Sequence, residues 1–178
     1  KNFFIIFNYF KKKNINVEIL TCNNDKKKKF NKNINIIGTK SSFWNNRSRK
    51  VKYLVCLFIL FFNLLYNKNE TLVFAFQANI YAILVSKILN KKIITRSNSS
   101  PSGWSKNFMK KIIFSFFLKK AEKIIVNSKD FKKEFYKKFN IKTKLIYNPL
   151  NKNEIIKKSK NKLDFNFFKS DKYLKIIN

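Results

Sequence analysis

The sequence predicts an α/β domain in which helices cover both faces of a parallel sheet, and three observations lead to this prediction. Short apolar runs typical of buried strands alternate with longer amphipathic stretches typical of helices over residues 2–150. Successive strands stand far enough apart for a helix to connect them, as parallel strands joined by right-handed crossovers require. The chain has 178 residues, of which 45% are hydrophobic, so one domain with a packed core is expected. The predicted fold is therefore Rossmann-like.

The first third of the chain predicts two helices and two short strands. In order, the expected elements are a helix over 2–13, a strand over Ile15–Cys22, a basic loop over Asn23–Asn33, a strand over Ile34–Ile37, a polar connection over Ser41–Asn46 and a helix over 47–66. The second helix contains the uninterrupted apolar run Tyr53–Phe62, whereas a bilayer span needs about 20 such residues. We therefore expect a buried helix there rather than a membrane-spanning one.

The remainder of the domain predicts four strands with helices between them. The expected strands are Thr71–Phe76, Lys92–Thr95, Lys123–Val126 and Lys144–Tyr147. The helix after the first strand places four aliphatic residues on its inner face, with Ser86 and Lys87 pointing away: Ile80, Ile83, Leu84 and Ile88. A second helix is expected over about 106–120. The last predicted helix of the domain begins after Ser128, which caps it, and has an inner face of phenylalanines: Phe131, Phe135 and Phe139.

The residue types present exclude several kinds of catalytic site. The chain contains no His, so Ser-His, Cys-His and His-metal chemistries cannot be built. Its two cysteines, Cys22 and Cys56, lie in apolar runs without C-x-x-C spacing, and they support neither a zinc finger nor a disulfide framework. The acidic residues show no paired spacing, and we expect no bound metal.

The charge of the chain suggests a nucleic-acid partner at first sight, but the residue types disfavour it. The net charge is +31, with 40 Lys and Arg against 9 Asp and Glu. Only three of these cations are Arg, the residue that reads bases and phosphates with two hydrogen bonds, and the lysines are spread along the chain. Abundant Lys, Asn, Ile and Phe fit an AT-rich genome. Helix-borne lysine pairs such as Lys119–Lys120 and Lys132–Lys133 would also suit an anionic membrane surface.

Polar residues follow each of the four predicted strands in the second half of the chain. They are Gln77 and Asn79 after the first strand, Arg96, Ser97 and Asn98 after the second, Asn127 and Ser128 after the third, and Asn148 after the fourth. Because parallel sheets bind ligands beyond the carboxyl ends of their strands, we expect these residues to share one edge and to form a site.

The loop from Arg96 to Ser105 is the most unusual segment. It concentrates residue types that are scarce elsewhere in the chain, including Arg96, Pro101, Gly103 and Trp104. A guanidinium beside hydroxyl groups suits a phosphate or a sugar, and an indole face suits stacking on a sugar ring. The alternative is an ordinary turn whose Trp104 packs on the core.

Four segments between Leu72 and Pro149 carry a resemblance to a known family. They read LVFAFQANIYAILVSKIL, KKIITRSN, AEKIIVNS and KLIYNPL. In this order and spacing they resemble the N-terminal domain of the GT-B, family 4 retaining glycosyltransferases. In that family a helix with small residues packs on the sheet after the first of these strands, and an "NS" or "S" helix cap follows the third.

The resemblance implies transfer of a sugar from a nucleotide-sugar donor to a glycan or lipid-linked acceptor with retained configuration, as in polysaccharide biosynthesis. It implies no cofactor and leaves the catalytic residues unassigned. The implied acceptor side comprises Gln77, Asn79, Arg96, Ser97, Asn98 and Trp104, and the implied interdomain cleft comprises Asn127, Ser128 and Asn148. Many members have a His near the position of Ser97 and Asn98. Its absence fits a mechanism carried by electrostatics and the donor's own phosphate.

The resemblance also implies a domain organisation. Residues 1–150 would form the acceptor-side domain without the family's first strand and Gly-rich turn, 151–170 an interdomain linker, and 171–178 the first strand of a donor-binding domain. The chain by itself is therefore expected to be an inactive fragment. The expected location is the cytoplasm, with peripheral attachment to the inner face of the cytoplasmic membrane as one form of it.

Two other classes of function stay open from the sequence. One is a non-catalytic basic module that binds anionic lipid or nucleic acid. The other is a different GT-B or Rossmann-like enzyme, such as a nucleotide-sugar epimerase. Purely electrostatic binding falls as salt rises, which distinguishes the first of these from a sugar site.

Overall fold

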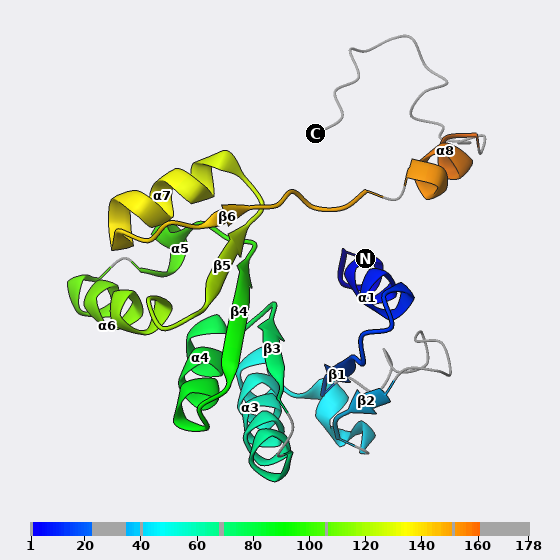
Figure 1. Cartoon of the computed structure of the whole chain (residues 1–178), viewed down its shortest axis with the longest axis horizontal. Helices are drawn as coiled ribbons and strands as arrows, with labels where there is room; N and C mark the ends of the chain where they lie inside the picture. Colours follow the sequence, from blue (N-terminus) through cyan, green and yellow to red (C-terminus); the bar gives the residue numbers. More distant parts are fainter. Residues whose placement is uncertain are drawn as a thin grey trace.

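The computed structural model describes residues 2–22, 35–39, 41–67, 70–105, 107–150 and 152–160. Its centre is a parallel sheet of four strands, β3 (Leu72–Ala75), β4 (Lys92–Ser97), β5 (Lys123–Val126) and β6 (Lys144–Leu145) (Figure 1). The strands pair in the order β3-β4-β5-β6, and helices flank the sheet. The predicted Rossmann-like parallel α/β fold is confirmed.

Helices connect the strands of this sheet. They are α4 (Asn79–Ile88), the single-turn α5 (Pro101–Trp104), α6 (Phe108–Leu118) and α7 (Lys129–Phe139). Because the strand order rises steadily along the chain, right-handed crossovers place α4, α6 and α7 on the same face, whereas the sequence predicts helices on both faces. The residues of the other face include Phe74, Ile94 and Ile125, each half-buried.

One hydrophobic core joins the sheet to these three helices. Its buried members come from alternate strand positions and from the inner helix faces: Ala75, Ile93, Ile124, Val126, Ala82, Ile83, Leu118, Phe135 and Phe139. The predicted inner face of α7 is confirmed, since Phe135 and Phe139 are buried and Phe131 packs against the core. Ser128 caps α7 as predicted, because its hydroxyl accepts a hydrogen bond from the amide of Phe131 at 3.1 Å.

The predicted inner face of α4 is wrong in part. Ser86 is fully buried, whereas Leu84 and Ile88, which were expected inside, are 39% and 63% exposed. The inner face is formed by Ala82, Ile83 and Ser86. Small side chains let the helix axis approach the strands closely, so close packing on the sheet outweighs the larger apolar area of Leu84 and Ile88.

The first third of the chain forms its own small sheet. The elements are α1 (Asn2–Lys12), β1 (Glu18–Leu20), β2 (Asn35–Ile37), the 3-10 helix η1 (Ser42–Asn46) and α3 (Arg49–Tyr66). The parallel pair β1–β2 is separate from the four-stranded sheet, whereas the sequence predicts both strands as part of one alternation. β1 contacts α3, and α3 contacts α4, so the helix connects the two sheets.

Helix α3 is less enclosed than the sequence predicts. Leu64 is its one fully buried residue, and an apolar stripe on the other side is exposed to solvent: Val51, Leu54, Phe58, Phe62, Leu65 and Tyr66. The buried helix expected from the apolar run is therefore half-buried. In the part of the chain that the structure covers, no helix combines the length and the apolar character needed to cross a membrane.

Several predicted boundaries shift by a few residues. Strand β4 continues to Ser97, so the predicted loop over 96–105 contains the end of a strand and the helix α5. Within the predicted linker, Lys152–Ser159 form helix α8. The predicted loop over Asn23–Asn33 and the predicted strand over 171–178 lie outside the described residues.

The fold brings the two cysteines together, which their spacing does not predict. The sulfur atoms of Cys22 and Cys56 lie 2.8 Å apart, and Cys22 is buried. Burial, followed by the hydrogen bond with Cys22, raises the pKa of the Cys56 thiol to about 12. The Cys56 thiol is therefore protonated at neutral pH, and its reaction as a thiolate becomes faster as the pH rises.

We expect oxidised glutathione to link Cys22 and Cys56. The two thiols form one disulfide, and the oxidant is reduced to two molecules of glutathione. A movement of about 1 Å brings the sulfurs to bonding distance. Mass spectrometry of the unreduced protein should show the loss of two hydrogen atoms and a cross-linked peptide, formed faster at alkaline than at neutral pH. Stable mixed disulfides with glutathione on both cysteines would contradict the prediction, and Cys56→Ser is the control that cannot cross-link.

Candidate functional site

The carboxyl ends of the four strands meet at one edge of the sheet. The register aligns Ala75 with Thr95, Ser97 with Val126, and Val126 with Leu145. The residues at the ends of these strands and just after them therefore gather at this edge. We call this edge the polar rim and define it as Gln77, Asn79, Arg96, Ser97, Asn98, Asn127, Ser128 and Asn148. Hydrogen bonds join Arg96 of β4 to Asn79, which follows β3, and to Asn148, which follows β6.

Arg96 is the centre of the polar rim. Its side chain is only 2% exposed, although it carries a positive charge. Its Nη2 atom donates hydrogen bonds to the carbonyl oxygen of Ile146 at 3.1 Å and to Oδ1 of Asn148 at 3.0 Å, and its Nε donates to Oδ1 of Asn98 at 3.3 Å. Burial lowers the pKa of the guanidinium, because desolvation disfavours the charged form. Arg96 thus holds the segment after β6 against the end of β4.

Asn79 and Asn127 each bring a buried carbonyl oxygen to the rim. Nδ2 of Asn79 donates to the carbonyl oxygen of Arg96 at 3.1 Å, which ties the start of α4 to β4. The Oδ1 atoms of Asn79 and Asn127 are buried, and neither has a hydrogen-bond partner among the described residues. A buried acceptor without a donor costs free energy. The residue before Asn79, Ala78, has the positive φ of 51°, a conformation that a side chain disfavours.

The exposed amides of the rim offer hydrogen-bond donors. Asn98 and Asn148 are both exposed, and the Oδ1 atom of each accepts a hydrogen bond from Arg96. The Nδ2 group of each amide is a donor that this contact does not use. Gln77 is exposed in the bend after β3 and adds a third amide. Neutral amides around a buried guanidinium suit a ligand that carries hydroxyl or phosphate groups.

The two predicted site serines have structural contacts. The hydroxyl of Ser97, which is buried, donates to the carbonyl oxygen of Ser99 at 3.1 Å. The hydroxyl of Ser128 caps α7, because it accepts a hydrogen bond from the backbone amide of Phe131. Both hydroxyls therefore shape the backbone at the rim.

Trp104 is partly buried and packs against the core. Its ring stacks on Phe139 with 5.7 Å between centroids and lies 5.3 Å from Phe114 and 6.2 Å from Phe135. This is the packing alternative that the sequence left open. The indole is engaged by these aromatic neighbours, and we leave Trp104 out of the proposed site.

Sequence reasoning missed a second polar cluster beside the rim. The carboxylate of Glu134 on α7 accepts hydrogen bonds from the hydroxyls of Ser100 and Ser102, the latter at 2.9 Å. The hydrogen bond from Ser100 is the main cause that lowers the pKa of Glu134. The Ser-Pro pair at 100–101 signals the start of a helix, but no local pattern indicates that its partner lies 34 residues further on. The cluster fastens α5 to α7.

Removal of this carboxylate should change how stability depends on pH. The pKa of Glu134 is lower in the folded chain than its usual 4.5, so its stabilising contribution is present above pH 4.5 and is lost as the pH falls through the folded-state value. We expect Glu134→Gln to lower the urea midpoint near neutral pH and to have a smaller effect in acid. The matched variant Glu70→Gln, at an exposed position, should leave the midpoint unchanged at both pH values. An equal loss for Glu134→Gln at both pH values would contradict the prediction.

Two hollows lie elsewhere on the described surface. One, of about 640 Å³, lies between β2 and α3 and is lined by Ile37, Phe58, Ile59, Phe62, Asn63, Tyr66 and Asn67. The other, of about 330 Å³, lies near the amino ends of β5 and β6 and includes Leu118, Lys123 and Lys144. Neither contains a rim residue. We choose the rim for its polar chemistry rather than for its depth.

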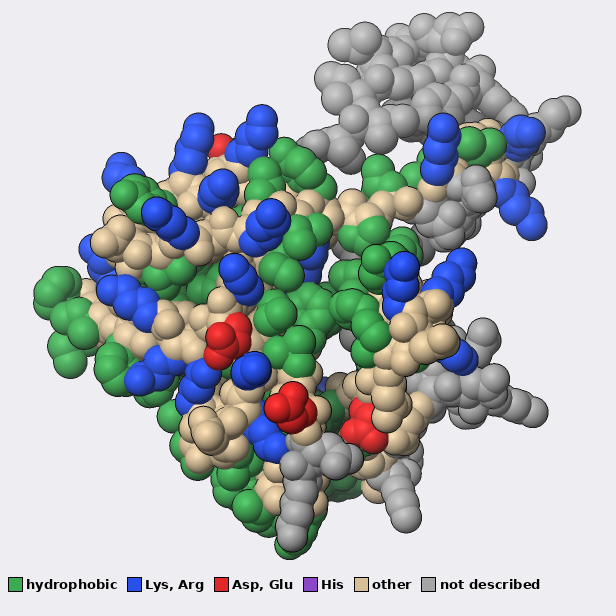
Figure 2. Space-filling view, viewed as in Figure 1, with side chains coloured by type: hydrophobic (Ala, Val, Ile, Leu, Met, Phe, Trp, Pro, Cys, Tyr) green, Lys and Arg blue, Asp and Glu red, His purple; other side chains and the backbone are tan. Residues whose placement is uncertain are grey.

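The charges on the face that Figure 2 shows form no single stripe. Figure 2 shows Lys and Arg side chains scattered over the visible face, with few acidic side chains among them. Within the described residues, no group of three or more His, Cys, Asp or Glu side chains is placed to hold a metal ion. Comparison with family models and with curated proteins gives no match for this chain.

Proposed function

We propose that this chain is the acceptor side of a glycosyltransferase, which transfers a sugar from a nucleotide-sugar donor to a glycan or lipid-linked acceptor. The polar rim is the observation that supports the proposal most directly. It combines a buried guanidinium, exposed amide donors and two buried amide oxygens without partners at the carboxyl edge of a parallel sheet. Such an edge is where ligands bind in sheets of this kind.

The rim residues have distinct proposed roles. The amides of Gln77, Asn98 and Asn148 would donate hydrogen bonds to acceptor hydroxyl or phosphate oxygens. Arg96 is a positioning residue, because it holds Asn98 and Asn148 and contributes positive potential beside them. These 178 residues contribute no imidazole for proton transfer, since they include no His.

Replacement of the rim asparagines by aspartate tests the proposal without removing the contacts of Arg96. Asn98→Asp and Asn148→Asp keep the oxygen that accepts from Arg96, but they remove the Nδ2 donor and add a negative charge. The probes are a neutral oligosaccharide and a sugar 1-phosphate, titrated into the chain and followed by NMR. We expect each variant to weaken binding at least about tenfold, as the loss of a hydrogen bond to a charged or polar group implies.

A matched variant controls for the change of charge. Asn46→Asp adds the same charge at an exposed position in η1 and should leave the affinity unchanged. Equal affinity of the Asn148→Asp and wild-type chains for both probes would refute the proposed site. Loss of binding as salt rises, with no preference among sugars, would instead support a basic binding module.

A further inference from the structure

Helix α6 carries an apolar surface that faces away from the protein. Successive helical residues are rotated by about 100°, so residues of one face recur every three or four positions. Leu118 is buried and Phe114 packs against the core, which fixes the inner side of α6. Five large apolar side chains lie on the opposite side and are 45–74% exposed: Phe108, Met109, Ile112, Ile113 and Phe116. We call these five residues the α6 ridge.

Lysines surround the α6 ridge. Lys110 and Lys111 lie beside it in the first turn, and Lys119 and Lys120 follow its C-terminal end. All four are exposed, and the ammonium group of Lys120 lies 4.6 Å from the centre of the Phe116 ring. Residues 108–120 include no acidic side chain. The helix therefore presents apolar groups at its centre and positive charge at its border.

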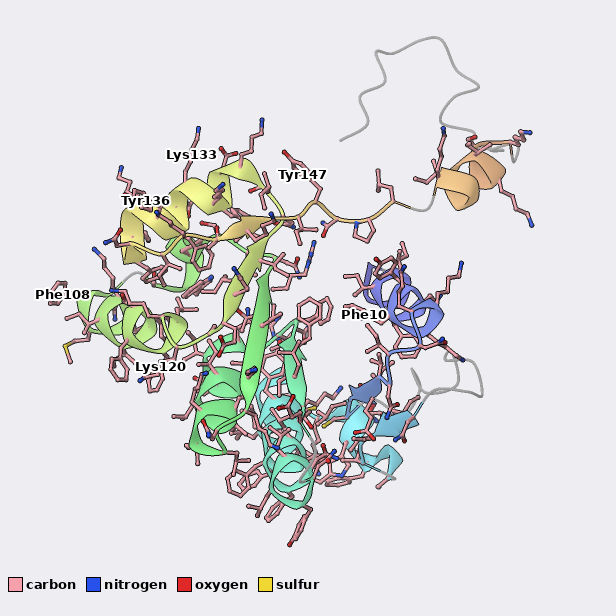
Figure 3. All side chains as sticks on the ribbon, viewed as in Figure 1. Phe10, Phe108, Lys120, Lys133, Tyr136 and Tyr147 are labelled. Atoms are coloured by element: carbon pink, nitrogen blue, oxygen red, sulfur yellow. The ribbon has the colours of Figure 1, made fainter. Side chains whose placement is uncertain are left out.

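The position of α6 leaves this surface accessible. The helix lies at the edge of the molecule, and Figure 3 shows Phe108 at its outer end, pointing away from the sheet. Figure 2 shows hydrophobic side chains over this end of the molecule with Lys side chains beside them. The neighbouring helix α7 adds the exposed Lys132, Lys133 and Lys137. An exposed apolar group of this kind marks a surface that meets another apolar phase.

From this combination we infer that α6 docks the protein on an anionic lipid bilayer. Phe108, Ile112 and Phe116 enter the boundary between headgroups and acyl chains, while the lysines bind anionic headgroups. A second copy of the chain suits the ridge less well, because a symmetric pair would bring the same four lysines against one another. A nucleic acid offers phosphates to the lysines but no apolar phase to the ridge. The inference is independent of the proposed sugar site.

Vesicle binding by the whole 178-residue chain tests the inference. The probes are vesicles of phosphatidylcholine with about one third phosphatidylglycerol, and vesicles of phosphatidylcholine alone. We expect the chain to sediment with the anionic vesicles and only weakly with the neutral ones. The triple variant Phe108→Gln, Ile112→Gln and Phe116→Gln should lower the partition coefficient for anionic vesicles at least about tenfold, because it removes the inserted apolar area.

A matched triple variant on α3 controls for general loss of apolar surface. Leu54→Gln, Phe58→Gln and Phe62→Gln change residues that are 49–64% exposed. Vesicle binding should stay within about twofold of wild type, since the exposed cations of α3, Arg49 and Lys50, lie at its first turn alone, whereas α6 has lysines at both ends of its ridge. Equal binding by the α6 variant and the wild type, or an equal loss in the α3 variant, would overturn the inference. So would absence of wild-type binding to the anionic vesicles.

Two further measurements cover the remaining outcomes. Sedimentation without lipid identifies a dimer that the α6 variant dissociates, and such a dimer without vesicle binding would assign the ridge to a second copy. Circular dichroism checks the fold of each variant. If the α6 triple variant does not fold, Lys119→Gln with Lys120→Gln serves instead, and it should weaken binding to anionic vesicles several-fold and leave binding to neutral vesicles unchanged. No effect of this pair would also overturn the inference.

Discussion

Arg96→Lys is expected to lower the free energy of unfolding by about 2 to 4 kcal/mol, although the substitution keeps the charge. The planar guanidinium reaches Asn98, the carbonyl oxygen of Ile146 and Asn148 at the same time. The lysine side chain is shorter, and its single ammonium group cannot donate to all three of these acceptors, which lie in different directions. It would leave oxygens of the rim without their donor and would itself be poorly solvated in the buried position of Arg96.

Urea unfolding of the wild-type and variant chains measures this effect. Arg49→Lys, at an exposed position in the first turn of α3, is the matched control and should change the free energy of unfolding by less than about 0.5 kcal/mol. If Arg96→Lys were as stable as wild type, the hydrogen bonds of Arg96 would be dispensable. Another interaction would then have to hold the side chains of Asn98 and Asn148 in place.

Phe135→Ala is expected to cost about 3 to 5 kcal/mol, the range for loss of a fully buried aromatic ring. Phe135 has 0% exposure and is in contact with Phe139 and Trp104, with ring centroids 5.8 and 6.2 Å away. Its ring joins α7 to α5 and to the strands of the core. The empty space would be surrounded by large rigid side chains, which cannot close it without leaving their own contacts.

The next residue along the helix provides the control for Phe135→Ala. Tyr136 is 58% exposed, so Tyr136→Ala removes an aromatic ring from the same helix without opening a cavity. Its expected cost in urea unfolding is below about 1 kcal/mol. Similar losses for the two variants would contradict the prediction, because they would show that burial in the core is not what distinguishes the Phe135 ring.

Much of the four-stranded domain could be predicted from local patterns. Strand β5 coincides with its predicted range, Lys123–Val126, because a short apolar run between polar residues has few other structures available. Helix α7 combines a serine cap with phenylalanines every four residues, and both signals act within one or two turns. The polar rim also follows from order along the chain, since parallel strands bring their carboxyl ends to one edge.

Other features depend on the packing of distant segments, and the sequence alone could not give them. Ser86 faces the sheet because a small side chain permits close approach, a property of the pair of elements rather than of the helix. The sulfurs of Cys22 and Cys56 meet only because β1 contacts α3. The separate pairing of β1 and β2 likewise concerns which strands become neighbours, a choice that their own three residues do not specify.

The sequence by itself determined the class of fold, the parallel order of the elements and the edge at which the polar residues gather. The tertiary structure decided what those residues do there. It joined Arg96 to Ile146 and Asn148 across some fifty residues of chain, placed Trp104 among Phe114, Phe135 and Phe139, and left the α6 ridge without a cover in the described part of the protein. The physical reason is range: periodicity and caps act over a few residues, whereas burial and buried hydrogen bonds are properties of segments that meet only in the folded chain.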